Sequence, residues 1–268
     1  MTDENRMATY LGAAKEAALA AAKVLAEWRE KFQVREKGRF DLVTEADEGS
    51  QKAIFEYLGG RFPDHRLLGE EGDAAKSRPT PDAPPTWIID PIDGTTNYVH
   101  DCPFYCISIG LQVAGKLVVG VVYDPVRDEM FAAAEGLGAY LNDKPIQPTP
   151  IDSLGQSLLA TGFPADLRGY EHVFELWQHF SYNVQALRRT GSTALNLAYV
   201  ACGRFDGFWA FDNKVWDVAG GVVLVQEAGG KITNVDGTPY DPFTPDSLAS
   251  NGVLHPVLLK EMEGRYKL

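Results

Sequence analysis

Apolar residues recur at helical spacing near the start of the chain. Over 7–33, Leu and Ala side chains share one face and charged side chains the other, which predicts a long amphipathic helix. A second helix is predicted over 45–60, with Gly59-Gly60 as its end. The polar stretch 34–41, which has a central glycine, predicts a loop or a loose hairpin between these helices.

The middle of the chain changes to the pattern of a sheet. Four prolines in 73–86 predict a surface loop, and a short apolar strand follows at 87–90. Residues 105–113, 116–124 and 129–135 are rich in β-forming side chains and are separated by turn residues. This spacing predicts an antiparallel meander.

The rest of the chain mixes short strands with helices. The expected strands lie at 157–162, 205–210, 231–235 and 247–251, and the expected helices at 168–181, 193–202, 217–228 and 256–265. Because strands and helices do not alternate regularly, we expect an α+β layered arrangement rather than a doubly wound sheet. A shift in composition near residue 150 predicts two halves, 1–150 and 151–268, within one compact unit.

Composition narrows the class of protein. The chain has 268 residues, 45% of them hydrophobic, and a formal net charge of -12. This balance is typical of folded proteins and argues against a direct nucleic-acid-binding surface, which needs clustered Lys and Arg. We expect a cytoplasmic protein, because the chain has three cysteines, an odd number, and does not start with the basic residues of a signal peptide. We expect no membrane span, because no apolar run is long enough.

The segment WIIDPIDGTTN, residues 87–97, carries the most informative chemistry. An apolar strand delivers Asp90 to its end, and a turn can bring Asp93 to the same point. Gly94 permits close approach of a ligand to the backbone, and Thr95 starts a short helix whose amides would face an anion. Carboxylates and carbonyls are the ligands of hard divalent cations. An ordinary Asp-Gly turn is the competing interpretation.

Four other acidic or polar motifs have ordinary structural explanations when each is taken alone. GEEG at 69–72 follows a short apolar strand and is typical of a solvated turn. DLVTEAD at 41–47 fits a helix capping box, and Asp217 fits an N-cap. GST at 191–193 also precedes a helix and fits a cap.

Together and in this order, DLVTEAD, GEEG, WIIDPIDGTTN, GSTALN and WDVAGG with EAGG resemble the motifs of the inositol monophosphatase family. These are magnesium-dependent, lithium-sensitive phosphatases, and the resemblance runs from residue 8 to residue 260. It implies a layered αβαβα sandwich of the inositol monophosphatase and fructose-1,6-bisphosphatase type, with the active site between the halves. It also implies a homodimer and sensitivity to Li⁺.

The resemblance implies a site for two to three Mg²⁺ ions. Glu70, Asp90 and the backbone carbonyl of Ile92 would hold one ion. Asp90, Asp93 and Asp217 would hold a second, so that Asp90 bridges the pair, and a third, weaker ion would lie near Glu70. Without cations, the crowded carboxylates would repel one another, and we expect the metal-free protein to be inactive and less stable.

The resemblance also implies the catalytic and substrate-binding roles. A metal-bound water positioned by Glu70 would attack the phosphorus, and Thr95, hydrogen-bonded to Asp47, would help to deprotonate it. The amides of Gly94 and Thr95 would hold the phosphate. The residues expected to contact the substrate are Asp93, Gly94, Thr95, Gly191, Ser192, Thr193 and Ala210. Lys37 and Arg39, in the polar stretch between the first two helices, would bring positive charge to the phosphate or remain solvated.

Ala210 is where the sequence departs from the family pattern. Family members that hydrolyse inositol phosphate commonly carry Glu at this position, seven residues before the metal-binding Asp217, to accept hydrogen bonds from ring hydroxyls. Asp212 is the candidate replacement. The substrate therefore stays open among polyol phosphates such as inositol 1-phosphate, histidinol phosphate, fructose 1,6-bisphosphate, NADP and adenosine 3′,5′-bisphosphate.

The sequence thus supports a Mg²⁺-dependent phosphomonoesterase as the first hypothesis. The second is a non-catalytic interaction role for the same fold. The complete set of expected metal ligands favours the enzyme. A calcium-binding structural domain is excluded, because no segment has the EF-hand loop pattern.

Overall fold

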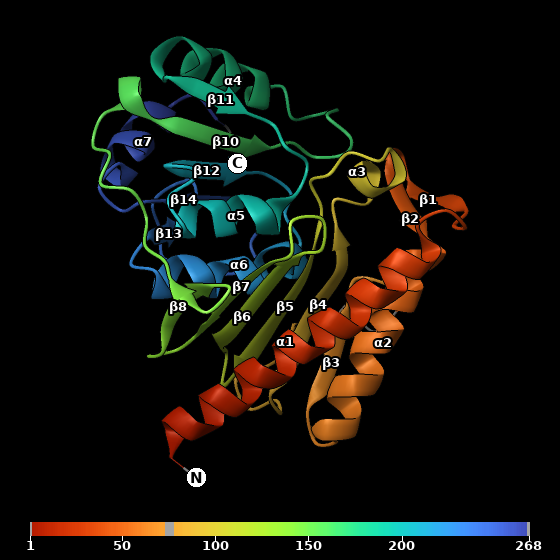
Figure 1. The fold of residues 1–268 in the computed structure, drawn as a ribbon. Coiled ribbons are helices and arrows are strands. Elements are labelled where there is room, and N and C mark those ends of the chain that lie inside the picture. Colours follow the sequence, from red (N-terminus) through yellow and green to blue (C-terminus); the bar gives the residue numbers. More distant parts are fainter. Residues whose placement is uncertain (1, 73–77, 267–268) are drawn as a thin grey trace.

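Five layers of helices and sheets are stacked in the computed structural model, which describes residues 2–72 and 78–266 (Figure 1). The outermost layer is formed by α1 (Asp3–Trp28) and α2 (Glu45–Arg61), which pack against each other and against one face of the large sheet. Helix α1 ends at Trp28, so the prediction that it continues to residue 33 is wrong. The expected loose hairpin is present as the antiparallel pair β1 (Val34–Gly38) and β2 (Asp41–Thr44).

The second layer is a seven-stranded sheet that contains the predicted meander. Its strands are β3 (Arg66–Gly69), β4 (Thr86–Asp93), β5 (Cys106–Val113), β6 (Lys116–Asp124), β7 (Glu129–Ala134), β8 (Gly138–Leu141) and β9 (Lys144–Pro145). They follow one another in sequence order across the sheet, and every pair is antiparallel except β3 with β4. The sequence analysis did not predict β8 and β9. Residues 73–77 of the predicted loop 73–86 lie outside the described residues.

The other three layers come from the second half of the chain. A mixed sheet has the strand order β11-β10-β12-β14-β13, formed by β10 (Leu158–Gly162), β11 (Ala186–Arg188), β12 (Gly207–Ala210), β13 (Lys231–Thr233) and β14 (Ser247–Ser250). Helices α5 (Thr193–Ala201) and α6 (Val215–Glu227) lie between the two sheets (Figure 1). Helices α4 (His172–Asn183) and α7 (His255–Met262) cover the outer face.

Three apolar cores hold the layers together. One joins α1 and α2 to the large sheet, one lies around α5 and α6, and one joins the smaller sheet to α4 and α7. The layered αβαβα prediction is therefore confirmed, whereas the boundary near residue 150 stays a prediction. Among the described residues, no helix has the length and apolar character that a membrane crossing requires.

The contact between α6 and the large sheet depends on glycine. A Cβ added to Gly120 of β6 would lie 2.1 Å from the carbonyl oxygen of Gly220 in α6, and one added to Gly110 would lie 2.6 Å from the Cβ of Ala219. Backbone atoms there have no free space into which they can move. The central helix layer can approach the sheet this closely only because side chains are absent.

We predict that Gly120→Ala lowers the free energy of unfolding by about 1–3 kcal/mol through overpacking. The matched control is Gly12→Ala in α1, where an added Cβ has no neighbour within 4 Å. That variant should be neutral or stabilised by up to ~1 kcal/mol, because alanine favours helix. Urea unfolding measures the free energy of unfolding of both variants, provided that the m value is unchanged. Equal stability of the two variants would contradict the packing argument.

Candidate active site

Strand β4 carries two buried carboxylates, Asp90 and Asp93, to one cavity. Residues three apart on a regular strand face opposite sides of the sheet. Here the register of β4 against β5 breaks between Asp90 and Asp93, and the Ile92 amide donates to Asp90 Oδ1 at 3.0 Å. This bulge lets both carboxylates line the same space.

Gly94 ends the bulge in a conformation that favours glycine. Its φ is 102°, in the left-handed region. An added Cβ would lie 3.1 Å from the Phe104 carbonyl oxygen and 3.2 Å from that of Gly191. The short helix α3 (Thr95–Val99) begins immediately afterwards, so its first amides lie beside the carboxylates of β4.

Asp93 is tied to the start of α5, about a hundred positions further along the chain. Its carboxylate accepts hydrogen bonds from the Ser192 hydroxyl at 2.7 Å, the Thr193 amide at 3.2 Å and the Ala194 amide at 2.5 Å. The Ser192 hydroxyl also accepts from the Leu195 amide at 3.2 Å. Ser192, expected to contact substrate, is thus buried, and its hydroxyl proton is donated to Asp93.

Asp217 reaches the cavity from the first turn of α6. One of its oxygens, Oδ2, accepts from the Lys214 amide at 2.8 Å, which is the capping contact. Its other oxygen has no hydrogen bond within the part of the chain that the structure describes. The interpretation of Asp217 as the N-cap is wrong, because α6 begins at Val215, Lys214 is its N-cap and Asp217 is its third residue. The Asp217 carboxylate accepts from the N-cap amide and also lines the cavity.

Glu70 enters from the turn after β3 and is paired with a lysine. The Lys37 ammonium donates to Glu70 Oε1 at 2.5 Å and to Glu71 Oε1 at 2.9 Å. Gln51 holds this turn in place by exchanging two hydrogen bonds with the Glu71 backbone, at 2.8 and 2.9 Å. The hairpin thus brings positive charge to the carboxylates through Lys37, whereas Arg39 lies over its neighbour Phe40 at 4.8 Å.

Asp47 and Thr95 are in contact. The Thr95 hydroxyl lies 3.1 Å from Asp47 Oδ1 and 3.0 Å from the Ile92 carbonyl oxygen, so it can donate its proton to either. The Thr44 amide and hydroxyl donate to Asp47 Oδ2 at 2.8 and 2.7 Å. Asp47 therefore completes the capping box of α2 with one oxygen and faces Thr95 with the other.

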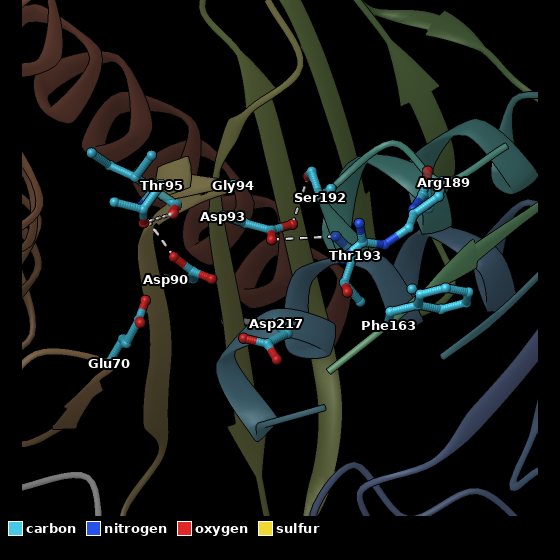
Figure 2. A pocket seen from close by; sticks show the side chains of 14 residues that line it. Glu70, Asp90, Asp93, Gly94, Thr95, Phe163, Arg189, Ser192, Thr193 and Asp217 are labelled. Carbon is cyan, nitrogen blue, oxygen red and sulfur yellow. Dashed lines mark hydrogen bonds between the residues drawn. The ribbon is translucent and has the colours of Figure 1, made fainter. Parts of the chain in front are cut away.

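Glu70, Asp90, Asp93, Thr95 and Asp217 line a cavity of about 210 Å³ (Figure 2), whereas Asp47 lies behind Thr95 and does not line it. Burial, then the nearby carboxylates of Glu70, Asp93 and Asp217, raise the pKa of Asp90. Burial, followed by the charge of Asp93, likewise raises the pKa of Asp217. The cavity is thus a place where several negative charges lie close together in low dielectric.

Burial also raises the pKa values of the neighbouring carboxyl groups. Burial raises the pKa of Glu70 to about 7 against the opposing charge of Lys37. Burial raises the pKa of Asp93 to about 6, although its three hydrogen bonds to Ser192, Thr193 and Ala194 lower it. Burial also raises the pKa of Asp47 to about 6.

The carboxylates surround the cavity without forming a closed cage. Among residues 2–72 and 78–266, no three His, Cys, Asp or Glu side chains converge tightly enough to hold a metal ion as they stand. Their chemistry nevertheless fits a hard divalent cation, because the donors are carboxylates and the Ile92 carbonyl. The Lys37 ammonium held by Glu70 is a cation already drawn to the cluster.

A second hollow adjoins the first and contains the position that departs from the family pattern. Both share Phe163, Thr193 and Asp217 in their walls, and Ala210 lines only the second, which measures about 360 Å³. Asp212 lines it too, but it is ion-paired with Lys214 at 2.7 Å. Gly191 and Thr193 line the first cavity, as expected of substrate contacts.

The sequence analysis missed several residues of the site. Phe163, Arg189 and Asn196 line the cavity, and the Cys106 thiol lies 3.8 Å from Asp93 Oδ2. The only local signal was the Arg188-Arg189 pair just before the GST motif. Phe163 carried none, because it reaches the cavity through the packing of the second half.

Comparisons with known proteins agree with this geometry. The model of the inositol monophosphatase family matches residues 6–266. The inositol-1-monophosphatase of Synechocystis is 44% identical over 250 residues, which cover 92% of this chain and 86% of the relative. The Nus factor SuhB of Pasteurella multocida is 39% identical over 235 residues, covering 86% of this chain and 87% of the relative.

Solved structures agree as well. The inositol monophosphatase from Anabaena (Nostoc) sp. PCC 7120 has a TM-score of 0.86 at 41% identity, covering 96% of each chain. An IMPase/NADP phosphatase complexed with Mg²⁺ and phosphate has a TM-score of 0.79 at 28% identity, covering 91% of this chain and 90% of the other. The motifs, the layered fold and these matches together show that the chain belongs to the inositol monophosphatase family and is a phosphoric monoester hydrolase.

Proposed function

We propose that this protein is a Mg²⁺-dependent phosphatase of small polyol phosphates such as inositol 1-phosphate. The observation that carries the proposal is the cavity in which Glu70, Asp90, Asp93 and Asp217 gather beside the first amides of α3. The names of the relatives support the substrate, and the complex of one relative with Mg²⁺ and phosphate supports the metal.

The metal would be held by the carboxylates of Glu70, Asp90, Asp93 and Asp217 and by the Ile92 carbonyl, with two to three ions per site. Bound Mg²⁺ neutralises the carboxylates, polarises the phosphate ester and lowers the pKa of water so that it becomes a nucleophile. The raised pKa values of Asp90 and Asp217 support this assignment, because burial and then the neighbouring carboxylates disfavour their charged forms, and a nearby cation would favour those forms.

The residues of the chain supply orientation and proton transfer. The amides of Gly94 and Thr95 would hold phosphate oxygens, and Glu70 would orient the attacking water. Asp47, whose pKa is raised to about 6 by burial, is suited to accept a proton through the Thr95 hydroxyl near neutral pH. Water adds to phosphorus, the ester P–O bond breaks, and the alcohol oxygen leaves with a proton.

The alcohol part of the substrate would lie toward Gly191, Thr193 and the adjoining hollow. Ala210 offers no hydrogen-bond acceptor there, and Asp212 is ion-paired with Lys214. Histidinol phosphate, fructose 1,6-bisphosphate, NADP and adenosine 3′,5′-bisphosphate therefore belong in any substrate panel beside inositol 1-phosphate.

We also propose, on the family resemblance, that the enzyme is a homodimer and is inhibited by Li⁺. The odd number of cysteines supports a cytoplasmic location. A second candidate function is a non-catalytic interaction role, which the Nus factor SuhB among the relatives favours. Activity measurements separate the two candidates.

The first prediction concerns activity. Purified protein should release phosphate from at least one panel compound only when Mg²⁺ is present. Glu70→Gln should lower kcat by about 10²-fold or more, because the group that orients water loses its charge. Glu71→Gln is the matched control, since Glu71 also binds Lys37 but does not line the cavity. A Mg²⁺-binding protein that hydrolyses nothing would support the interaction role instead, and equal losses in both variants would contradict the role given to Glu70.

The second prediction concerns stability against pH. Asp47, Asp93 and Glu70 have pKa values raised to about 6, 6 and 7, so the folded state keeps protons that the unfolded chain has lost. The metal-free protein should therefore lose stability as pH rises from their ordinary pKa values through these raised ones. Its Tm should be lower at pH 8 than at pH 5.5, and Mg²⁺ should raise Tm more at pH 8.

Asp90→Asn provides the control for this stability measurement. Removing one buried carboxylate should flatten the fall in Tm of the metal-free protein with pH, although activity is lost. Scanning calorimetry with EDTA or Mg²⁺ measures both. If neither Mg²⁺ nor this substitution changes the Tm, the charged carboxylates do not destabilise the metal-free protein, which would contradict the prediction.

A further inference from the structure

One positively charged side chain lines the otherwise acidic cavity. Among the described residues that line it, Arg189 is the one Lys or Arg, whereas four others are carboxylates. In Figure 2 it lies beyond Thr193, at the end of the cavity away from Glu70 and Asp90. Within residues 2–72 and 78–266, its guanidinium has no hydrogen-bond or ion-pair partner. Its charge is therefore available to a ligand.

The position of Arg189 is supported by aromatic packing. Its guanidinium carbon lies 5.0 Å from the centre of the Phe163 ring, in a cation–π contact. Phe163 is held in turn by edge-on contacts with Phe174 at 5.9 Å and Trp177 at 5.7 Å, both from α4. Stacking uses the face of the guanidinium and leaves its in-plane N–H groups free to bind.

The backbone next to Arg189 is fixed to the helix that carries Thr95. The Asn97 side chain in α3 donates to the Thr190 carbonyl oxygen at 2.8 Å and to that of Phe104 at 2.7 Å. A Cβ on Gly191 would lie 2.8 Å from Asn97 Nδ2, so the two segments are in close contact. The backbone that follows Arg189 is thus held against α3, whereas the Arg189 side chain is exposed.

We propose that Arg189 selects phosphate monoesters whose alcohol part carries a second phosphate group. This inference rests on the proposed function and specifies its substrate class. A planar guanidinium binds phosphate through paired, charge-assisted hydrogen bonds. The adjoining hollow, which meets the Arg189 cavity at Phe163, offers little to a neutral polyol, because the Ala210 side chain has no acceptor and Asp212 is engaged by Lys214.

The test compares two substrates that share the reacting group. Fructose 1-phosphate and fructose 1,6-bisphosphate carry the same C1 phosphate, and only the second carries another. The kcat/KM for release of the C1 phosphate, followed through the sugar product, should be about tenfold higher for the bisphosphate. Arg189→Gln should remove this preference and leave turnover of fructose 1-phosphate within about threefold.

Arg188→Gln is the matched control. Arg188 is adjacent and exposed, but it does not line the cavity, and its guanidinium donates to the Leu187 carbonyl oxygen at 3.1 Å. This variant should keep the wild-type preference. Equal losses on both substrates in Arg189→Gln would overturn the proposal, because they would mean that Arg189 binds the reacting phosphate or supports folding. An unchanged preference would overturn it too.

Binding separates this inference from the proposed function. If the wild-type protein hydrolyses neither compound, the proposed function fails for sugar phosphates. Calorimetric binding of fructose 1,6-bisphosphate with Ca²⁺ present then tests whether Arg189 binds a second phosphate. Binding at least about tenfold weaker in Arg189→Gln than in wild type supports the second-phosphate site. Equal affinity, or no binding by either protein, overturns it.

Discussion

The hydrogen bonds that Asp93 accepts from the start of α5 join the two halves of the chain at the active site. Asp93 ends a strand of the large sheet, and Ser192, Thr193 and Ala194 begin a helix of the central layer. These bonds fix the distance between the carboxylates of β4 and the residues of the second half that line the cavity. Without these hydrogen bonds, the distance between the two sides of the cavity would not be fixed.

The same arrangement has an electrostatic cost. Burial raises the pKa values of Asp90, Asp93 and Asp217, and the neighbouring carboxylates add to the shift at Asp90 and Asp217. Lys37 relieves part of this repulsion at Glu70. Such a cluster is expected to destabilise a metal-free form, and a cation bound among the carboxylates would offset this cost.

Much of the fold could be predicted from the pattern of side chains. Long periodic segments, such as the one that begins at Asp3, and the meander of β5 to β7 have strong signals. β9 and β11 have too few residues to show a period, and β8 follows a glycine-rich turn. Helix α1 ends at Trp28, although the following residues to 33 include neither Gly nor Pro and so carry no strong local stop signal.

Some residues of the site could likewise be predicted from local sequence, and others could not. Asp90, Asp93 and Gly94 could be predicted because an apolar strand and a glycine are local features, although the expected turn after Asp90 is a bulge within β4. The resemblance added Glu70, Asp47 and Asp217, which local spacing alone explains as caps or a turn. Contacts between distant segments, such as Lys37 with Glu70 or Arg189 with Phe163, depend on how the layers stack, and no local pattern encodes them.

We propose that the buried carboxylates form a cation site whose protons leave when metal binds. Titration of Mg²⁺ into the metal-free protein, by calorimetry at pH 6.5 in buffers of different ionisation enthalpy, measures that exchange directly. The account predicts saturable binding with release of about one proton or more per site, and less release at higher pH. Binding without proton release, or no binding at all, would contradict it.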